Sequence, residues 1–303
     1  MPATIIALAV STLYIVFTVW LAHWLRLYAT YFIEQPLVKS LFLEAIATAE
    51  LCGACFELII IADNWGVSMY AIYLFVLTVY WSMTWGDASA CPYTHLEDMV
   101  LGNKSVRIAF LLIWAEFLGG IAVFKYIQVL WALEIVSTHK NRAFGDCTTD
   151  LQARPSLLRG CIMLRNVMTI PINSTRNTVV PVLIGALIEC VATCICRVVS
   201  RVLGDLNPRF STVIDSFVGT SLVVAGRREP PILFDGMKAF NYSGGYFNPA
   251  LATSLKCGCL GTTFIEHVTV YWIGACVGSI ASLRVYKMPF VQNFVEQRKE
   301  KIA

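Results

Sequence analysis

The sequence predicts an all-α membrane protein that crosses the bilayer several times, and two observations support this fold class. Of the 303 residues, 57% are hydrophobic and only 14% are charged, whereas an ordinary soluble domain is about 25% charged. The apolar residues also gather in runs as long as a bilayer core of about 30 Å requires. Because so few polar residues cannot cover a water-facing surface, the apolar excess faces lipid. This composition excludes a soluble enzyme and a disordered chain.

Seven runs are apolar enough to form membrane helices, at 3–25, 41–62, 66–85, 106–131, 179–200, 211–226 and 264–284. The run at 211–226 is short and carries Asp215, so hydropathy supports it least. The first run has no basic segment before it and no clear cleavage site, which favours a retained anchor over a cleaved signal peptide. Whether residues 3–25 span the bilayer or lie along its interface stays open.

The basic residues give an orientation. Arg26 and Lys39 follow the first run and place its C-terminal end in the cytosol. With that topology, twelve Lys and Arg residues are cytosolic and nine lie on the opposite side, several of them in the connection 137–178. That basic connection weakens the rule, because such loops are usually cytosolic. Asn173 and Asn241 begin glycosylation motifs on the non-cytosolic side, for which chance occurrence is the preferred interpretation.

Charge and cysteine content exclude further classes of protein. The net charge of +3 comes without a concentrated basic stripe, so no nucleic-acid partner is expected. Most of the 11 cysteines lie inside apolar runs, where a thiol packs as a small hydrophobe, so no disulfide framework is expected. Cys52 and Cys55 have redox-motif spacing, but no βαβ pattern surrounds them and packing is preferred. Four isolated histidines predict no zinc site, and no other cofactor is indicated.

An internal repeat relates the two halves of the chain. Glu44-Ala-Ile-Ala-Thr48 and Glu189-Cys-Val-Ala-Thr193 each place an acid and a hydroxyl one helical turn apart within an apolar run. A carboxylate inside a membrane helix is normally turned to the bundle interior and hydrogen-bonded. Two of them at matching positions therefore indicate one structural role performed twice, as buried acids that hold neighbouring backbone. Two unrelated polar substitutions are the alternative.

A short proline box follows each repeat segment after one more apolar run. The boxes are Cys91-Pro92-Tyr93 and Asn248-Pro249-Ala250. Asn is a preferred N-cap and Pro is favoured at the first helical position, so the second box predicts a helix start. That helix is too short to cross a membrane, because only about eight residues precede Cys257-Gly-Cys. Three spans per half also make the repeat inverted, so two half-helices would meet at the midplane from opposite faces.

The two boxes, the paired acids and the helix order resemble the aquaporin (major intrinsic protein) family over roughly residues 40–287. Within it, Cys91-Pro92-Tyr93 as the first box and the extra N-terminal apolar run look like the unorthodox, subcellular branch, the superaquaporins. The resemblance implies six transmembrane helices and two re-entrant half-helices, here with an additional N-terminal helix. It also implies a homotetramer with one pore per subunit, in intracellular membranes such as the endoplasmic reticulum, the plasma membrane being an alternative.

The resemblance assigns a pore lining, made of Cys91, Pro92, Tyr93, Asn248, Pro249, Ala250 and Leu251, with Ala71 as a guess for the second-helix constriction. Departures from the family pattern change its chemistry. Cys91 offers only a weak S–H donor where the family has an amide. Tyr93 replaces a small residue and either swings outward or narrows the path. Leu251 replaces the Arg of classical water channels, so we expect an uncharged, more hydrophobic constriction.

The sequence divides into five segments. They are an N-terminal hydrophobic helix with its connector (1–36), a first half-repeat (37–136), a basic connecting loop (137–178), a second half-repeat (179–288) and a polar C-terminal tail (289–303).

The leading hypothesis is a passive transmembrane channel for water and small neutral solutes such as glycerol or hydrogen peroxide, with no catalytic residues. The alternative from another class is a non-conducting membrane scaffold, favoured by the lost Asn, the lost Arg and the bulky Tyr93. A membrane hydrolase using His95 with Glu97 or Asp98 lacks a nucleophile, so these three are expected to lie at the pore mouth or surface.

Overall fold

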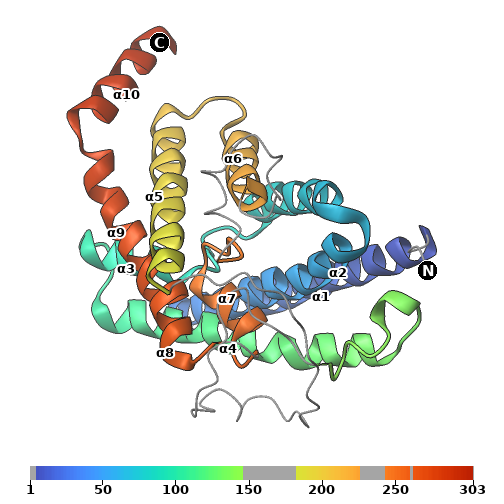
Figure 1. Ribbon diagram of the computed structural model, residues 1–303. Helices are drawn as coiled ribbons and strands as arrows, with labels where there is room; N and C mark the ends of the chain where they lie inside the picture. Colours follow the sequence, from blue (N-terminus) through green and yellow to red (C-terminus); the bar gives the residue numbers. More distant parts are fainter. Residues whose placement is uncertain (1–4, 146–181, 226–242, 260–261, 303) are drawn as a thin grey trace, which may run out of the picture.

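The computed structural model describes residues 5–145, 182–225, 243–259 and 262–302 of the 303-residue chain, and this part is helical without strands (Figure 1). Five helices are long and apolar enough to cross a membrane: α1 (Ile5–Phe32), α2 (Pro36–Thr84), α4 (Val106–Ala132), α5 (Val182–Leu206) and the continuous helix Phe264–Tyr286. The shorter apolar helix α6 (Ser211–Ala225) covers the weakest of the predicted runs. The predicted all-α membrane fold is confirmed.

Helix α2 contains two of the predicted spans. Its 49 residues are interrupted at Gly66, whose backbone has φ 84° and ψ 171° and is not helical. The chain turns back there, as Figure 1 shows, so that the two arms of α2 run in opposite directions. The indole nitrogen of Trp85, just after the second arm, donates to Glu50 of the first arm at 3.0 Å. A glycine tolerates this positive φ without the steric strain that a side chain would add.

The N-terminal helix α1 packs lengthwise on α2 and reaches α4 through individual side chains. Tyr14 donates to the carbonyl of Leu130 at 3.1 Å, near the end of α4. Further along α1, the buried Arg26 forms an ion pair with Glu50 of α2. At about 1.5 Å per residue, the 28-residue helix α1 is longer than a bilayer core is thick. These contacts place α1 beside the spanning helices as a further crossing.

Two half-helices enter the bundle. They are α3 (Pro92–Val100, 9 residues) and α7 (Pro249–Lys256, 8 residues). At about 1.5 Å per residue each is less than half as long as a membrane core is thick. Their N-terminal ends meet, because the Asn248 side chain donates to the Ala90 carbonyl at 2.7 Å. Non-spanning backbone at this depth is tolerated because protein surrounds it.

The repeat is visible in the packing of the helices. Gly119 of α4 lies against the carbonyl of Ala45, one residue after Glu44. Gly278 of α9 (Ala275–Tyr286) lies in the same way against the carbonyl of Cys190, one residue after Glu189. A Cβ at either glycine would collide with that carbonyl oxygen. In each half, the last spanning helix therefore packs backbone to backbone on the first.

The remaining described elements are short. The segment Phe264–Tyr286 consists of α8 (Phe264–His267), the π-helical η4 (Val268–Gly274) and α9, and the chain ends in α10 (Pro289–Ile302). A 3-10 turn, η1 (Ser137–His139), follows α4. The glycosylation motifs at Asn173 and Asn241, and residues 146–178 of the predicted connecting loop, lie outside the described residues.

One expectation about the cysteines is wrong. Cys257 and Cys259, which follow α7, are disulfide-bonded. The expectation rested on thiols buried within apolar helices, and it holds for Cys52, which is fully buried and unbridged. The Cys-Gly-Cys segment lies beyond the end of α7, outside the apolar helices on which the expectation rested.

Candidate functional site: a pore at the junction of two half-helices

Glu44 holds the turn that precedes the first half-helix. Its carboxylate accepts hydrogen bonds from the backbone N–H groups of Ser89, at 3.0 Å, and Ala90, at 2.9 Å. Ala90 has φ 50°, a left-handed conformation that is unfavourable for a residue with a side chain. Glu44 itself is 2% exposed. The buried acid thus fixes the strained backbone from which α3 begins.

Glu189 does the same for the second half-helix. Its carboxylate accepts from the backbone N–H of Phe247 at 2.8 Å and from that of Tyr246 at 3.3 Å. Phe247 has φ 48°, matching Ala90 in the first half. Glu189 is completely buried. The two repeat acids occupy equivalent places, each holding the residue immediately before a helix start.

The two helix starts have the same backbone and different caps. Cys91 has φ −148° and ψ 113°, and Asn248 has φ −147° and ψ 114°. The Asn248 oxygen accepts from the N–H groups of Ala250, at 3.0 Å, and Leu251, at 3.2 Å. Cys91 makes no side-chain cap bond. Only the second half-helix is therefore capped in the way that the Asn-Pro-Ala box predicts.

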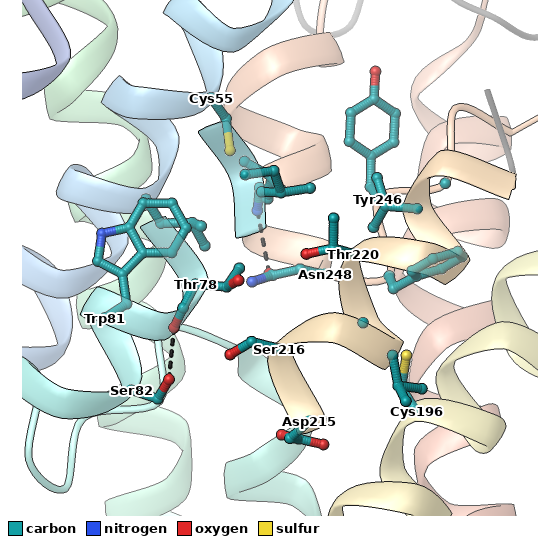
Figure 2. Close-up of a pocket in the computed structure, with 18 of the residues that line it drawn as sticks. Cys55, Thr78, Trp81, Ser82, Cys196, Asp215, Ser216, Thr220, Tyr246 and Asn248 are labelled. Carbon is teal, nitrogen blue, oxygen red and sulfur yellow. Dashed lines mark hydrogen bonds between the residues drawn. The ribbon is translucent and has the colours of Figure 1, made fainter. Parts of the chain in front are cut away.

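A cavity of about 430 Å³ runs past Asn248 (Figure 2). Leu251 and Leu255 of α7 line it on one side of Asn248, with Cys55 of α2. On the other side it reaches Ser200 and Asp215, near the ends of α5 and α6 that the predicted topology places in the cytosol. The cavity therefore extends along the bundle on both sides of the half-helix junction.

Polar side chains surround Asn248 in the middle of the cavity. Figure 2 shows Thr78 of α2 and Thr220 and Ser216 of α6 around the Asn248 amide. Ser216 and Thr220 are four residues apart, so they share one face of α6. Asp215 accepts from Ser200 at 2.7 Å at the lower end of the same view. This polar stripe on α6 escaped the sequence analysis, although hydroxyls at helical spacing in an apolar run were a usable signal.

Only some residues of the predicted pore lining are lining residues of the cavity. Tyr93, Asn248 and Leu251 line the cavity. The residues Cys91, Pro92, Pro249 and Ala250 are buried in the junction itself and are not among the lining residues. Ala71 does not line the cavity, because its neighbours Tyr70 and Leu74 occupy the face of α2 that does.

Cys91 faces away from the cavity. Its buried thiol side packs with Ala275 and Cys276 of α9, alongside Tyr93. The backbone of Cys91 matches that of Asn248, but its side chain is shorter than the Asn248 amide and stays in contact with α9. The cavity cysteines are instead Cys55 and Cys196, which no box motif indicated.

Tyr93 lies inside the cavity wall rather than swinging outward. It is 8% exposed, and the guanidinium carbon of Arg197 lies 5.8 Å from the centre of its ring. Arg197 belongs to α5 and also lines the cavity. An arginine over an aromatic ring is a favourable cation–π arrangement. Arg197 was expected only as one of the cytosolic basic residues, and its position beside the cavity was not predicted.

Glu97 and His95 are buried, so their expected place at a mouth or surface is wrong. Glu97 is 2% exposed and accepts from Arg197 Nε at 2.8 Å, from Arg201 and from Ser279. His95 is 1% exposed. Helix α3 packs on α4 and α9, and α5 reaches Glu97 through Arg197 and Arg201, contacts that the sequence around the first box could not reveal. Asp98 is the partly exposed member, paired with Lys104 at 2.9 Å.

Among the described residues, one group has ligand atoms close enough together to hold a metal ion. It consists of Glu44, His95 and Glu116. His95 Nε2 lies 3.3 Å from Glu44 and 3.4 Å from Glu116. The ammonium of Lys104 lies 3.2 Å from His95 Nδ1 and can only donate. The imidazole thus lies between the Lys104 ammonium at Nδ1 and the two carboxylates at Nε2, and these groups fit a buried cluster of the protein's own charged side chains.

Comparisons with known proteins find similarity to aquaporins over most of the chain. The chain is 25% identical over 288 residues to Aquaporin-11 of Milnesium tardigradum, which covers 94% of this chain and 89% of that protein. It is 24% identical over 267 residues to Aquaporin-12 of Mus musculus (85% and 79%), and 22% identical over 282 residues to Aquaporin-11 of Homo sapiens (88% and 86%). No family model and no solved structure matches.

The fold and the site define a multi-pass helical membrane protein built as an inverted repeat around two half-helices. The comparisons support a membrane channel. Its curated homologues are aquaporin-11 and aquaporin-12, the unorthodox branch of the aquaporins that the Cys91-Pro92-Tyr93 box indicated.

Proposed function

We propose that this protein is a passive channel for water and small neutral solutes. The observation that carries the proposal is the cavity that continues on both sides of Asn248, where the tips of α3 and α7 meet. Half-helices that join with their N-terminal ends present a positive potential at that point. Such a centre admits neutral molecules and opposes cations and protons.

The chemistry of the cavity centre suits water. The Asn248 amide carries two N–H donors, of which Ala90 takes one, so the other can donate to a passing molecule. The hydroxyls of Thr78, Ser216 and Thr220 supply exchangeable donors and acceptors around it. A water that leaves bulk solution can therefore replace its lost hydrogen bonds there. One amide instead of two gives weaker orientation than in a channel with two Asn-Pro-Ala boxes.

The half of the cavity beside α7 is apolar. Leu251 and Leu255 line it together with Leu51 and Cys55. Tyr246 adds a hydroxyl on this side (Figure 2), but none of the described lining residues there is charged, so this part discriminates little between water and a small solute such as glycerol or hydrogen peroxide. We therefore include these solutes in the proposal.

We place the protein in intracellular membranes as a homotetramer, with the α7 side facing the lumen. The disulfide-bonded Cys257 and Cys259 support this orientation, because disulfides persist in oxidising compartments and not in the cytosol. The predicted topology, with Arg26 and Lys39 in the cytosol, puts the same end of the bundle in the lumen. The proposed role needs no catalytic residue and no cofactor.

The test is osmotic shrinkage of liposomes that contain the purified protein, followed by stopped-flow light scattering. We expect water to leave faster than from empty liposomes. Thr220→Trp puts a large side chain into the cavity and should abolish the increase. Leu187→Trp makes the same change at an exposed position of α5 and should preserve it. Shrinkage no faster than in empty liposomes, for water and glycerol alike, would refute conduction.

The second candidate is a non-conducting membrane scaffold. The observation that favours it is the Tyr93 ring, which with Arg197 forms part of the cavity wall beside the junction. Under this hypothesis Thr220→Trp would leave the cellular phenotype unchanged, because the cavity would not matter. Loss of the phenotype in that variant, but not in Leu187→Trp, would exclude the scaffold.

A further inference from the structure

Arg197 places a positive charge inside the cavity. It lies on α5, lines the cavity and stacks over the Tyr93 ring at 5.8 Å. Tyr93 follows the tip of α3 by one residue, so the guanidinium lies close below the junction on the side that leads to Ser200 and Asp215. On the other side of the junction, the lining positions Leu251 and Leu255 carry no charge.

The guanidinium is held in one orientation. Arg197 donates to both oxygens of Glu97, from Nε at 2.8 Å and from Nη2 at 2.5 Å. Such two-point pairing fixes the plane of an arginine as well as its position. Glu97 is also bound by Arg201 and by Ser279 of α9, which holds the carboxylate from two further directions. Arg197 is therefore a fixed charge and not a mobile side chain in the path.

Glu97 does not cancel this charge. Two guanidiniums, of Arg197 and Arg201, share the single Glu97 carboxylate, which leaves the group of three with one excess positive charge. Arg201 does not line the cavity, whereas Arg197 does. The excess charge is therefore presented to the cavity by Arg197.

Asp215 is the anionic residue that lines the same cavity. Its partner Ser200 lies three residues after Arg197 on α5, about 4.5 Å further along the helix axis. A cation that enters from this end meets Asp215 before it meets Arg197. The acid can gather cations at the entrance, but the arginine stands between them and the junction.

We propose that Arg197 adds a fixed positive charge that reinforces the exclusion of cations at the half-helix junction, in the half of the cavity opposite to the uncharged Leu251. The inference rests on the proposed channel function and adds its charge selectivity. A fixed cation in a narrow cavity with low-dielectric walls repels other cations strongly, because solvent screens it poorly there. Neutral molecules pass the guanidinium, which can donate hydrogen bonds to them.

The test compares Arg197→Gln with Arg201→Gln in liposomes, measuring potassium flux together with water flux. Both substitutions remove one guanidinium from Glu97, but only Arg197 lines the cavity. We expect Arg197→Gln to raise potassium permeability at least tenfold over wild type while osmotic shrinkage remains measurable. Arg201→Gln keeps the Arg197 guanidinium at the cavity but removes the excess charge of the group, so its potassium flux should lie between those of wild type and Arg197→Gln.

Loss of Arg197 leaves Glu97 with one cation fewer, which could unfold the single variant. The triple variant Arg197→Gln, Arg201→Gln and Glu97→Gln removes all three charges of the group and should show the same potassium leak. Water flux without a potassium leak in either variant would overturn the inference and leave the channel proposal standing. Wild-type liposomes that pass no water and no solute would instead overturn the channel proposal, and the selectivity with it.

Discussion

Asn248 donates a hydrogen bond from its side-chain amide to the backbone carbonyl of Ala90 at 2.7 Å, joining half-helices that lie 158 residues apart in the sequence. The oxygen of the same amide caps α7 through the N–H groups of Ala250 and Leu251. One side chain thus starts one half-helix and ties it to the turn before the other. Cys91, at the equivalent position, makes no cap bond.

Replacing Asn248 should therefore cost more stability than replacing Cys91. Asn248→Ala removes the cap and the bond to Ala90, and we expect the free energy of unfolding to fall by about 1–3 kcal/mol. Cys91→Ala removes only packing against Ala275 and Cys276, so the loss should be smaller. Thermal unfolding of both variants in detergent micelles measures the difference. Equal losses would contradict a bridging role for the amide.

The glycine contacts of the repeat predict a second pair of results. Gly119→Ala and Gly278→Ala each force a Cβ into a carbonyl of the neighbouring helix, so both should destabilise the bundle, by about 1–3 kcal/mol. Gly204→Ala on α5 is the control, because no atom lies within 4 Å of its added Cβ. There the alanine should stabilise the helix, by about 0.5–1 kcal/mol.

These three variants are compared by unfolding temperature in the same detergent. A neutral Gly278→Ala would mean that α5 and α9 are not packed backbone to backbone, and the equivalence of the two halves would fail at that contact.

Thiol reagents should act on the cavity through cysteines outside the proline box. Cys55 and Cys196 line the cavity, whereas Cys91 packs against α9. We expect a small mercurial to reduce water flux in the wild type and in Cys91→Ser. The double variant Cys55→Ser with Cys196→Ser should conduct without this sensitivity. Protection by Cys91→Ser alone would show that the Cys91 thiol, and not these two, faces the permeant.

The sequence predicted the half-helix junction because its signals are local. Asn and Pro at a helix start have a direct backbone meaning, and Glu44 and Glu189 were conspicuous as acids in apolar runs. The helical runs were equally clear, since a bilayer sets their length. Even the break in α2 falls at the boundary of two predicted spans, since Gly66 is the first residue of the second one.

The lining of the cavity was harder to predict, because it depends on how each helix is rotated about its axis. Arg197 read as one more cytosolic charge until α5 turned it toward Tyr93. His95 and Glu97 were expected at the surface because α3 has a mixed composition. Neighbouring helices cover these two side chains only in the folded bundle. No local pattern distinguishes such a residue from a solvated one.

The ion pair between Arg26 and Glu50 attaches the additional helix α1 to the bundle, and it supplies the last prediction. Arg26 is 7% exposed and Glu50 1%, and Trp85 donates to the same carboxylate at 3.0 Å. Arg26→Leu leaves a buried carboxylate without its cation, so the free energy of unfolding should fall by about 3–5 kcal/mol. The double variant Arg26→Leu with Glu50→Met removes both charges and should recover most of that loss, because replacing a buried pair with apolar residues of similar size is often nearly neutral. Unfolding of both variants in detergent gives the comparison. A double variant as unstable as the single one would show that the loss comes from the packing of the Arg26 side chain between α1 and α2 and not from an unpaired carboxylate.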